Sequence, residues 1–338
     1  MTPVESSNRS RCSATYLTIR IVFCLTGIFC LAGCGGTDTS IITPPLPPSA
    51  PLSSSRLGPH VLGTDVNNAG AVTILSGCPR VAKWIAPTPG IDLAISNYKS
   101  RCPGGTAILR VYVAPSIAGY TVADDPAASA NDFWNKMAIQ GLSAAGPANR
   151  IDWLEGPNEI ENLPNWYNDL TAANWVAAFW SALADLMHNA GYNPLVGSLT
   201  GGQPSPVTIF APLAAVMKSK MYKWGWSYHS YTFTATTSVN TEMALALYYR
   251  QIRDQNGLAG IPLVLSEGGY LTPSSTGWQG QLTNDQYLAW LKWFDIQMKQ
   301  DPEVLGLTIF QVGNTTDFQS FELTPISHEL AKYLMTGS

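Results

Sequence analysis

Residues 262–270 read PLVLSEGGY, a short apolar run that ends in a single acidic residue, Glu267, followed by two glycines. A short apolar run between turn-forming residues is typical of a buried strand in a parallel sheet. From residue 59 onward, seven comparable runs alternate with longer helical segments. The eight predicted strands are residues 60–65, 81–85, 107–113, 151–154, 194–199, 225–231, 262–266 and 306–310.

Two of the intervening segments have the spacing of amphipathic helices. In the first, apolar side chains recur at i, i+3, i+4, i+7 and i+11, namely Val176, Phe179, Trp180, Leu183 and Met187. Residues 287–298 repeat this spacing, and Thr283 followed by Gln286 predicts an N-terminal capping box. Strands that alternate with helices predict a parallel sheet, and eight such units predict its closure. We therefore expect an α/β fold, a single-domain (β/α)8 TIM barrel over residues 58–338.

The first 57 residues have the features of a targeting signal and a tether. Three arginines precede an apolar run over residues 21–32, which is short for a bilayer span but matches a secretory signal. The run leads into LAGC, and this resembles the bacterial lipoprotein box. The resemblance implies a signal peptide over residues 1–33, lipidation of Cys34 and membrane anchoring in the bacterial cell envelope; an ordinary signal peptide is the alternative. Residues 34–57, rich in Gly, Ser, Thr and Pro, predict a semi-extended tether.

Composition and cysteines limit the classes of function. Hydrophobic residues make up 46% and charged residues 12%, and the net charge is −4, with no basic stripe that would indicate a nucleic-acid partner. The four histidines lack a metal-binding spacing, and phosphate-loop and serine-hydrolase motifs are missing, so we expect no metal and no cofactor. Cys78 and Cys102 can form one disulfide in an exported domain, with two buried thiols as the alternative. We expect a monomer.

Two acidic residues follow strands that are far apart in the chain. Residues 151–154 are followed by EGPNE, which ends in Asn158 and Glu159, and residues 262–266 are followed by Glu267. In a (β/α)8 barrel the catalytic groups lie at the carboxyl ends of the strands, so we expect both glutamates at the barrel mouth. Hydrolysis of a glycosidic bond needs two carboxyl groups, one protonated and one ionised.

These residues resemble the signature of the clan A glycoside hydrolases, which include family 5. That signature has Asn-Glu after strand four, here Asn158-Glu159, and a glutamate that ends strand seven, here Glu267. Family 5 adds a His-x-Tyr on strand six, here His229 and Tyr231. The resemblance implies that Glu159 is the acid/base, that Glu267 is the nucleophile and that Asn158 binds the sugar 2-hydroxyl; it also implies a preference for β-linked sugars. Period-two alternation puts His229 and Tyr231 on one strand face, from which Tyr231 would reach Glu267.

Several positions depart from the family pattern or need a partner. Family members usually carry a tryptophan at the end of strand eight, whereas this chain has Phe310 and Gln311, one of which must replace it. Arg110 interrupts an apolar strand, so it either orients Glu267 or another carboxylate, or forms a structural salt bridge at the barrel base. Trp278, in the Gly/Ser/Thr-rich loop after Glu267, is the best candidate for an aromatic platform at the mouth.

Alternatives remain open at four residues. Glu155 and Glu161 lie in the same loop as Glu159, and either is an alternative proton donor. His229 has the alternative of a buried core histidine, and Asp65 can either bind sugar or form an Asx-turn.

We therefore predict a retaining glycoside hydrolase that cleaves a β-linked poly- or oligosaccharide by double displacement. The main alternative is a carbohydrate-binding lipoprotein on a barrel scaffold without catalysis. Another barrel hydrolase or lyase, which would form no glycosyl-enzyme intermediate, is a further alternative.

Overall fold

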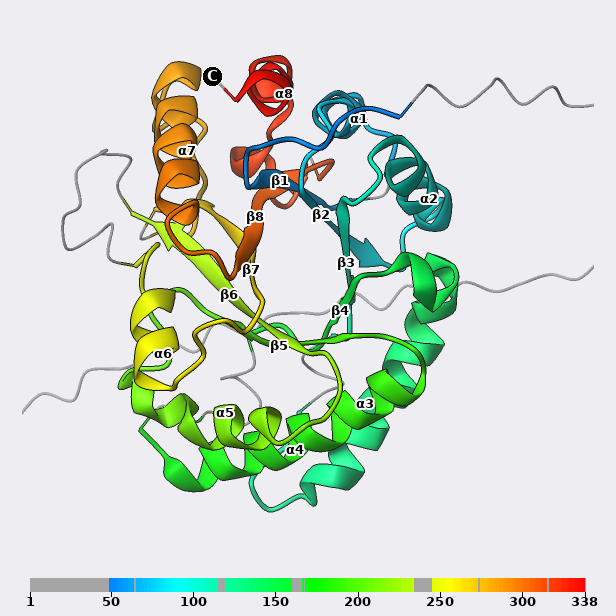
Figure 1. The fold of residues 1–338 in the computed structure, drawn as a ribbon, viewed down its shortest axis with the longest axis vertical. Helices are drawn as coiled ribbons and strands as arrows, with labels where there is room; N and C mark the ends of the chain where they lie inside the picture. Colours follow the sequence, from blue (N-terminus) through cyan, green and yellow to red (C-terminus); the bar gives the residue numbers. More distant parts are fainter. Residues whose placement is uncertain are drawn as a thin grey trace, which may run out of the picture. The chain divides into compact units, whose positions relative to one another are not determined.

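The computed structural model describes residues 49–337 apart from 64, 115–118, 160–165, 167, 234–244, 273 and 315. The predicted signal peptide, Cys34 and Glu161 lie outside the described residues. Eight parallel strands close into a barrel in sequence order, and β8 pairs with β1 (Figure 1). The prediction of a single-domain (β/α)8 barrel is confirmed.

All eight predicted strands are present; residues 194–199 have the predicted bounds, and the other seven strands have at least one shifted end. The strands are β1 (Leu57–Val61), β2 (Val81–Ala86), β3 (Thr106–Val111), β4 (Trp153–Glu155), β5 (Pro194–Leu199), β6 (Gly225–Thr232), β7 (Leu263–Tyr270) and β8 (Val304–Val312). The helices are α1 (Ala69–Ser76), α2 (Ile91–Arg101), α3 (Pro126–Gln140), α4 (Leu170–Asn189), α5 (Ala211–Lys218), α6 (Tyr249–Gln255), α7 (Asn284–Met298) and α8 (Ser327–Thr336). Short 3₁₀ turns lie at Leu142–Ala145, Ala148–Arg150, Val207–Phe210, Gln319–Phe321 and Thr324–Ile326.

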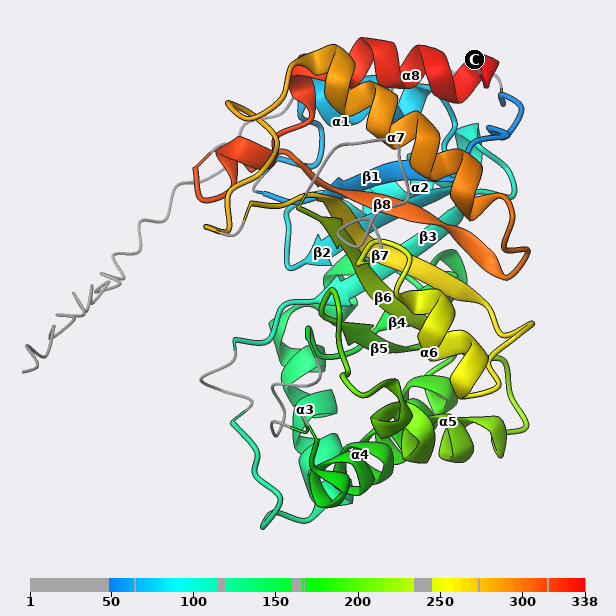
Figure 2. The same ribbon diagram turned by 90° about the vertical axis from the view of Figure 1, so that its left-hand side faces the viewer.

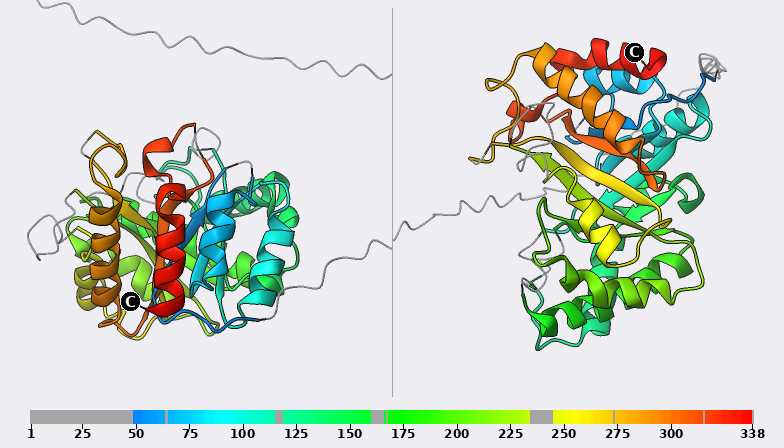
Figure 3. Two further views of the ribbon diagram at one scale, coloured as in Figure 1. Left: turned by 90° about the horizontal axis from the view of Figure 1, so that it is seen from above. Right: turned by 60° about the vertical axis from the view of Figure 1, so that its left-hand side comes forward.

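The helices form a layer outside the strands, with α7 and α8 on one side of the barrel and α3, α4 and α5 on the other (Figure 2). Seen from above, α8 lies beside α1, so the last helix closes the ring against the first (Figure 3). The apolar stripes predicted for α4 and α7 are buried. The predicted capping box is also present, because the Thr283 hydroxyl oxygen accepts from the Gln286 N–H and the Gln286 side chain accepts from the Thr283 N–H.

The lumen is filled in layers because strand residues two apart point the same way. Near the amino ends of the strands the layer is apolar and buried, and it consists of Val81, Ile108, Trp153, Leu195 and Val264. Two residues further along β2, β3 and β4 stand Lys83, Arg110 and Glu155, all buried. The apolar layer therefore closes the bottom of the barrel, and charged side chains occupy the layer beneath the mouth.

The folded domain begins before residue 58, which corrects the end predicted for the tether. The Ala50 N–H donates to the Arg101 carbonyl (2.8 Å), and the hydroxyl of Ser53 donates to the Leu334 carbonyl (2.6 Å). Leu57, at the start of β1, is fully buried. Residues 50–57 thus pack on the barrel.

A disulfide joins Cys78, just after α1, to Cys102, at the end of α2. It ties the first two strand–helix units together on the outer face of the barrel. Within the residues that the structure describes, no helix has the length and apolar character needed to cross a membrane.

Candidate active site

Glu267 lies on β7 at the carboxyl end of the barrel and is 6% exposed. Its Oε1 is 3.0 Å from Nη1 of Arg110 and 3.3 Å from Nζ of Lys83. Its Oε2 accepts a hydrogen bond from the hydroxyl of Tyr231 (3.1 Å) and lies 3.8 Å from Nδ1 of His229. Both carboxylate oxygens therefore have partners, which fixes the orientation of the group.

The surroundings of Glu267 keep it ionised. Burial raises the pKa of this carboxyl, but the charges of His229, Lys83 and Arg110 outweigh burial and hold the pKa well below its ordinary value. Burial and the charge of Glu267 raise the pKa of Tyr231, so the phenol stays protonated and donates. A carboxylate with a depressed pKa is a weak proton acceptor, but it can attack an electrophilic carbon.

Glu159 follows β4 and lines the same cleft as Glu267. It has φ = +48°, a backbone conformation that residues other than glycine rarely adopt. Its Oε1 lies 3.5 Å from Nδ1 of His229, which is itself 3.8 Å from Oε2 of Glu267. The two carboxylate oxygens are therefore at most about 7.3 Å apart, the sum of those two distances.

His229 is fully buried, as the core alternative requires, but it also contacts both glutamates. Its Nε2 is within hydrogen-bond distance of the hydroxyl of Ser198 (3.0 Å), which leaves Nδ1 facing the carboxylates. Burial alone would lower the pKa of His229, yet the charge of Glu267 and the contact with Glu159 outweigh it, and the pKa is raised above 6.5. The positively charged form is favoured between the two acids.

Sequence reasoning missed a buried ion pair beneath Glu267. Lys83 on β2 is fully buried, and its Nζ lies 2.6 Å from Oε2 of Glu155, which is also fully buried. Burial raises the pKa of Glu155, but the charges of Lys83 and Arg110 outweigh burial and lower it. Glu155 is therefore the counter-charge of an interior lysine and does not line the cleft, which removes it as an alternative proton donor.

His60 on β1 is a second residue that the sequence did not point to. It is fully buried, with Nδ1 3.8 Å from Oε1 of Glu267. Burial and the charge of Lys83 hold its pKa well below 6.5, so the ring is neutral at neutral pH. It packs edge-on against Phe310, with ring centroids 5.3 Å apart. His60 thus fills the lumen between the nucleophile candidate and the aromatic side of the cleft.

Arg110 lies at the mouth end of β3 rather than at the barrel base, which decides between its two alternatives. Its Nη1 donates to Oε1 of Glu267 and to Oδ1 of Asn158. One guanidinium nitrogen thereby connects the carboxylate on β7 to the loop after β4, and it fixes Asn158 beside Glu159.

These side chains line a cleft of about 350 Å³ at the barrel mouth. Its polar lining consists of Arg110, Asn158, Glu159, Tyr231, Glu267 and Ser275, and its apolar and aromatic lining of Leu62, Ile85, Tyr112, Leu271, Phe310, Phe318 and Phe321. An apolar concavity with a few convergent polar groups is typical of a small-molecule or ligand-chain site.

The two residues at the end of β8 have different roles. Phe310 lines the cleft, so it is the one of the two residues that contributes a ring to the site. Gln311 is fully buried and does not reach the cleft, because its side-chain amide donates to the carbonyls of Asn314 and Phe318. It holds the loop after β8 in place.

Two other expected sugar contacts are structural instead. Trp278 is 2% exposed, stacks on Tyr287 with ring centroids 4.8 Å apart, and does not line the cleft, so it is not the aromatic platform expected there. Its indole N–H donates to the Phe321 carbonyl (3.3 Å). The Asp65 carboxylate accepts from the Asn67 N–H (2.8 Å), which is the Asx-turn alternative.

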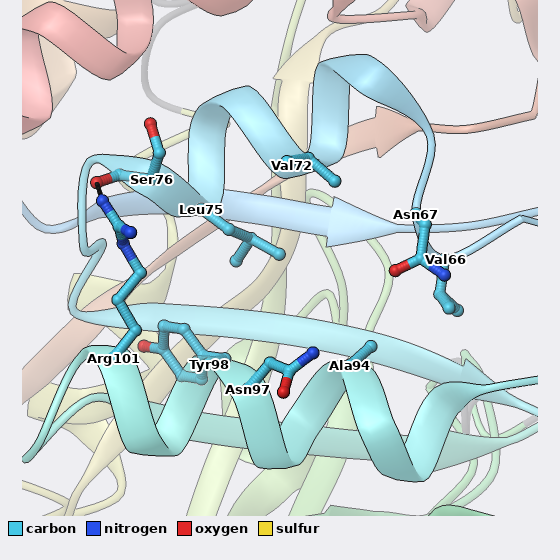
Figure 4. Close-up of a pocket in the computed structure, with 9 residues that line it drawn as sticks. All are labelled: Val66, Asn67, Val72, Leu75, Ser76, Ala94, Asn97, Tyr98 and Arg101. Atoms are coloured by element: carbon cyan, nitrogen blue, oxygen red, sulfur yellow. Dashed lines mark hydrogen bonds between the residues drawn. The ribbon is translucent and has the colours of Figure 1, made fainter. Parts of the chain in front are cut away.

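A second hollow, of about 250 Å³, lies on the outer face between α1 and α2 (Figure 4). It is lined by Val66, Asn67, Val72, Leu75, Ser76, Ala94, Asn97, Tyr98 and Arg101. Arg101 reaches across it and donates to the Ser76 carbonyl (3.2 Å). Its lining carries no carboxylate, histidine or cysteine that could perform acid–base or nucleophilic chemistry, whereas the barrel mouth carries several. In the described part of the chain, no cluster of His, Cys, Asp and Glu is arranged to hold a metal ion.

Comparisons with known proteins show what fold this chain shares. No protein-family model and no curated protein matches its sequence. A β-1,3-glucanase and allergen of Cryptomeria japonica pollen is similar in structure (TM-score 0.51, 13% identity, 79% of this chain and 95% of that one). A GH128 subgroup II endo-β-1,3-glucanase from Sorangium cellulosum is similar as well (TM-score 0.51, 14% identity, 84% of this chain and 98% of that one). So is a glucosidase from Croceicoccus marinus (TM-score 0.55, 10% identity, 84% of this chain and 68% of that one). At these identities the likeness is one of fold.

Proposed function

We propose that the protein is a retaining glycoside hydrolase that cleaves a β-linked poly- or oligosaccharide, with Glu267 as the nucleophile and Glu159 as the acid/base. The observation that carries the proposal is that both glutamates line one cleft, with oxygens at most about 7.3 Å apart, the sum of the two His229 distances. Carboxyl pairs about 5–5.5 Å apart serve retention, and pairs about 6.5–9.5 Å apart serve inversion. The bound excludes most of the inverting range and so favours retention.

The contrast between the two acids supports their separate roles. An inverting enzyme needs a carboxylate that takes a proton from water, and a low pKa makes a carboxylate a poor base. Glu267 has this low pKa and is buried among cations, whereas the side chain of Glu159 is 36% exposed and contacts one histidine. Glu267 is thus suited to attack, and Glu159 to exchange protons with substrate and water.

The proposed reaction has two steps. In the first, the Glu267 carboxylate attacks the anomeric carbon while Glu159 donates its proton to the glycosidic oxygen; the carbon–oxygen bond breaks and the alcohol leaves. In the second, Glu159 takes a proton from water, whose oxygen attacks the anomeric carbon, and the bond to Glu267 breaks. Tyr231 and Arg110, which contact the two oxygens of Glu267, aim it in the first step and stabilise it as the leaving group in the second.

The first substrates to test are β-glucans. Two of the structures with a similar fold are described as β-1,3-glucanases, and the third as a glucosidase. We also propose that the enzyme is tethered to the bacterial cell envelope through lipidated Cys34, on the basis of the LAGC sequence after the apolar run. Labelling with a fatty-acid analogue and its loss in Cys34→Ala tests this anchoring.

The central test is hydrolysis of a panel of β-glycans, with β-1,3-glucan first, and NMR of the first anomer released. We expect the product to keep the substrate's β configuration, and a 2-fluoro sugar to label Glu267, as read by peptide mass spectrometry. Glu267→Ala should lose almost all turnover, and azide should restore part of it as the α-glycosyl azide. The control is Glu329→Ala, an exposed glutamate on α8, which should keep wild-type rates.

Other outcomes are equally clear. Inverted product would contradict retention, and wild-type activity in Glu267→Ala would remove the nucleophile assignment. Binding of a glycan without any hydrolysis would favour the non-catalytic carbohydrate-binding lipoprotein.

A further inference from the structure

Three exposed aromatic side chains mark the end of the barrel that carries the cleft. Among the described residues, the large apolar side chains that are exposed include the aromatic residues Tyr112 (54% exposed), Phe233 (40%) and Phe318 (38%). Tyr112 directly follows β3, Phe233 directly follows β6, and Phe318 lies in the loop after β8. All three therefore lie at the carboxyl ends of strands. Aromatic faces left in solvent at a ligand cleft are typical of sites for rings that have an apolar face.

Two of the three line the cleft itself, and the third does not. Tyr112 and Phe318 line the cleft together with both glutamates. Tyr112 continues the inward alternation of Arg110, and its N–H donates to the Ala86 carbonyl (2.8 Å), which extends the β2–β3 pairing. Its position is therefore set by the barrel.

The ring of Phe318 is held from behind by other aromatic rings. It meets Phe310 edge to face, with centroids 5.1 Å apart, and Phe321 with centroids 6.3 Å apart. This support keeps a flat apolar surface at the cleft without loss of side-chain entropy on binding.

The order of the strands places one of these two rings beside each glutamate. Tyr112 follows β3, which pairs with β4, the strand that leads to Glu159. Phe318 follows β8, which pairs with β7, the strand that carries Glu267. Tyr112 therefore lies on the Glu159 side of the mouth, and Phe318 lies on the Glu267 side. The acid/base faces the sugar that leaves and the nucleophile faces the sugar that is attacked, so one ring is available on each side of the bond.

We propose that Tyr112 and Phe318 bind sugar rings on opposite sides of the bond to be cleaved, so that the cleft takes an extended neutral glycan and cuts it internally. This inference rests on the proposed function. We infer a neutral glycan because Arg110 is the one cation in the described lining of the cleft, and it already binds Glu267 and Asn158. A chain of uronic acids would need further cations there.

The test compares Tyr112→Ala and Phe318→Ala with Phe233→Ala, a matched control of the same residue type and similar exposure that lies outside the cleft. Each full-length variant is assayed on the β-glycan that the wild type cleaves fastest, on its oligosaccharides, and on the matching aryl monosaccharide. We expect Phe318→Ala and Tyr112→Ala each to raise KM for the polymer about tenfold, the scale of one lost apolar contact. We expect both variants to raise KM less for the aryl glycoside, which has one sugar ring, than for the polymer, and Phe233→Ala should behave as wild type.

The mode of cleavage gives a second readout. For the wild type, viscosity of the polymer should fall well before reducing ends accumulate, as internal cleavage requires. Release of only mono- or disaccharides from the start, or equal KM in all three variants, would overturn the inference while leaving the hydrolase assignment intact. No hydrolysis of any glycan by the wild type would instead overturn the proposed function.

Discussion

Replacing Lys83 by methionine should both destabilise the protein and move the acid limb of its pH–rate profile. The methionine side chain has a similar length but no charge. It would leave Glu155 and Glu267 in the lumen without the cation that lies 2.6 Å from one and 3.3 Å from the other. All three side chains are nearly or completely buried, so water cannot replace the lost charge.

The size of the effect follows from these distances. With an effective dielectric constant of about 20, Coulomb's law gives about 6 kcal/mol for the pair with Glu155 and about 5 kcal/mol for the pair with Glu267. The burial cost of the lysine offsets much of this, and breaking a buried ion pair typically costs about 3–5 kcal/mol in unfolding free energy. We expect a loss in that range at pH 7 for Lys83→Met.

The dependence on pH has a definite sign. Both carboxylates have a folded-state pKa below the ordinary 4.5, so the stability they contribute is present above that value and is lost as pH falls through the folded pKa. In Lys83→Met these two pKa values rise, so the stability gap to wild type should be largest above about pH 5 and should narrow in acid. The acid limb of kcat/KM, which follows ionisation of Glu267, should move up by about 1–2 pH units, because Arg110 and His229 remain.

Urea unfolding followed by tryptophan fluorescence at pH 7 and pH 4.5, with kcat/KM measured across pH, provides the assay. Lys99→Met is the matched control: Lys99 lies 2.7 Å from Asp152, but the two side chains are 26% and 35% exposed, so we expect a loss of about 0–1 kcal/mol. If Lys83→Met is too unstable to assay, adding Glu155→Gln should recover part of the stability, since no orphan charge then remains. Unchanged unfolding free energy together with an unmoved acid limb in Lys83→Met would refute the reasoning.

Three further predictions concern other parts of the molecule. The folded-state pKa of His229 is raised, so the stability that its charge contributes is full below about pH 6.5 and is lost as pH rises through that pKa. Urea unfolding should therefore show the difference in unfolding free energy between wild type and His229→Gln becoming smaller from pH 6 to pH 9. A constant difference would contradict this prediction. Replacing Cys78 and Cys102 by alanine opens a loop of sequence separation 24 and should lower the unfolding free energy by about 3 kcal/mol without changing kcat; a drop in kcat would tie the disulfide to the site. Glu159→Ala should slow unactivated glycosides by about 10²–10⁴-fold, but aryl glycosides with a good leaving group much less, and equal losses on both would exclude an acid role.

The architecture could be predicted because it follows from local patterns of apolar residues along the sequence. Eight apolar runs with helices between them leave few ways to bury every strand, and the positions of Glu159 and Glu267 followed once strand order was fixed. The strand ends were less accurate: β7 continues through Glu267 to Tyr270, because Gly268 and Gly269 keep the pairing with β6. Gly269 does so at φ = +142°, a conformation that residues with a side chain rarely adopt.

Only part of the charged layer in the lumen could be predicted from the sequence. Arg110 was noticed because it interrupts an apolar strand, and Lys83 in VAKWIA on the neighbouring strand satisfies the same criterion. What the sequence does not contain is which acid meets which cation, because Glu155 and Glu267 belong to strands far along the chain. The burial of Trp278 is of the same kind, since a loop rich in small residues gives no sign that α7 packs beneath it.

The position of His229 explains how one site can serve both steps of the proposed reaction. During the first step Glu267 loses its negative charge to the new ester bond, and Glu159 gains one as it gives up its proton, so a negative charge moves from one glutamate to the other. Nδ1 of His229 lies 3.8 Å from the first and 3.5 Å from the second, so a charged imidazolium faces that negative charge at nearly equal distance before and after the step. Ser198 holds the opposite ring nitrogen, which keeps the ring from turning toward either acid. A neutral glutamine there carries no charge to stabilise either glutamate, so we expect His229→Gln to slow glycosylation and deglycosylation alike. The pre-steady-state burst rate and the steady-state kcat should then fall by similar factors. A fall in only one of them would contradict the shared role.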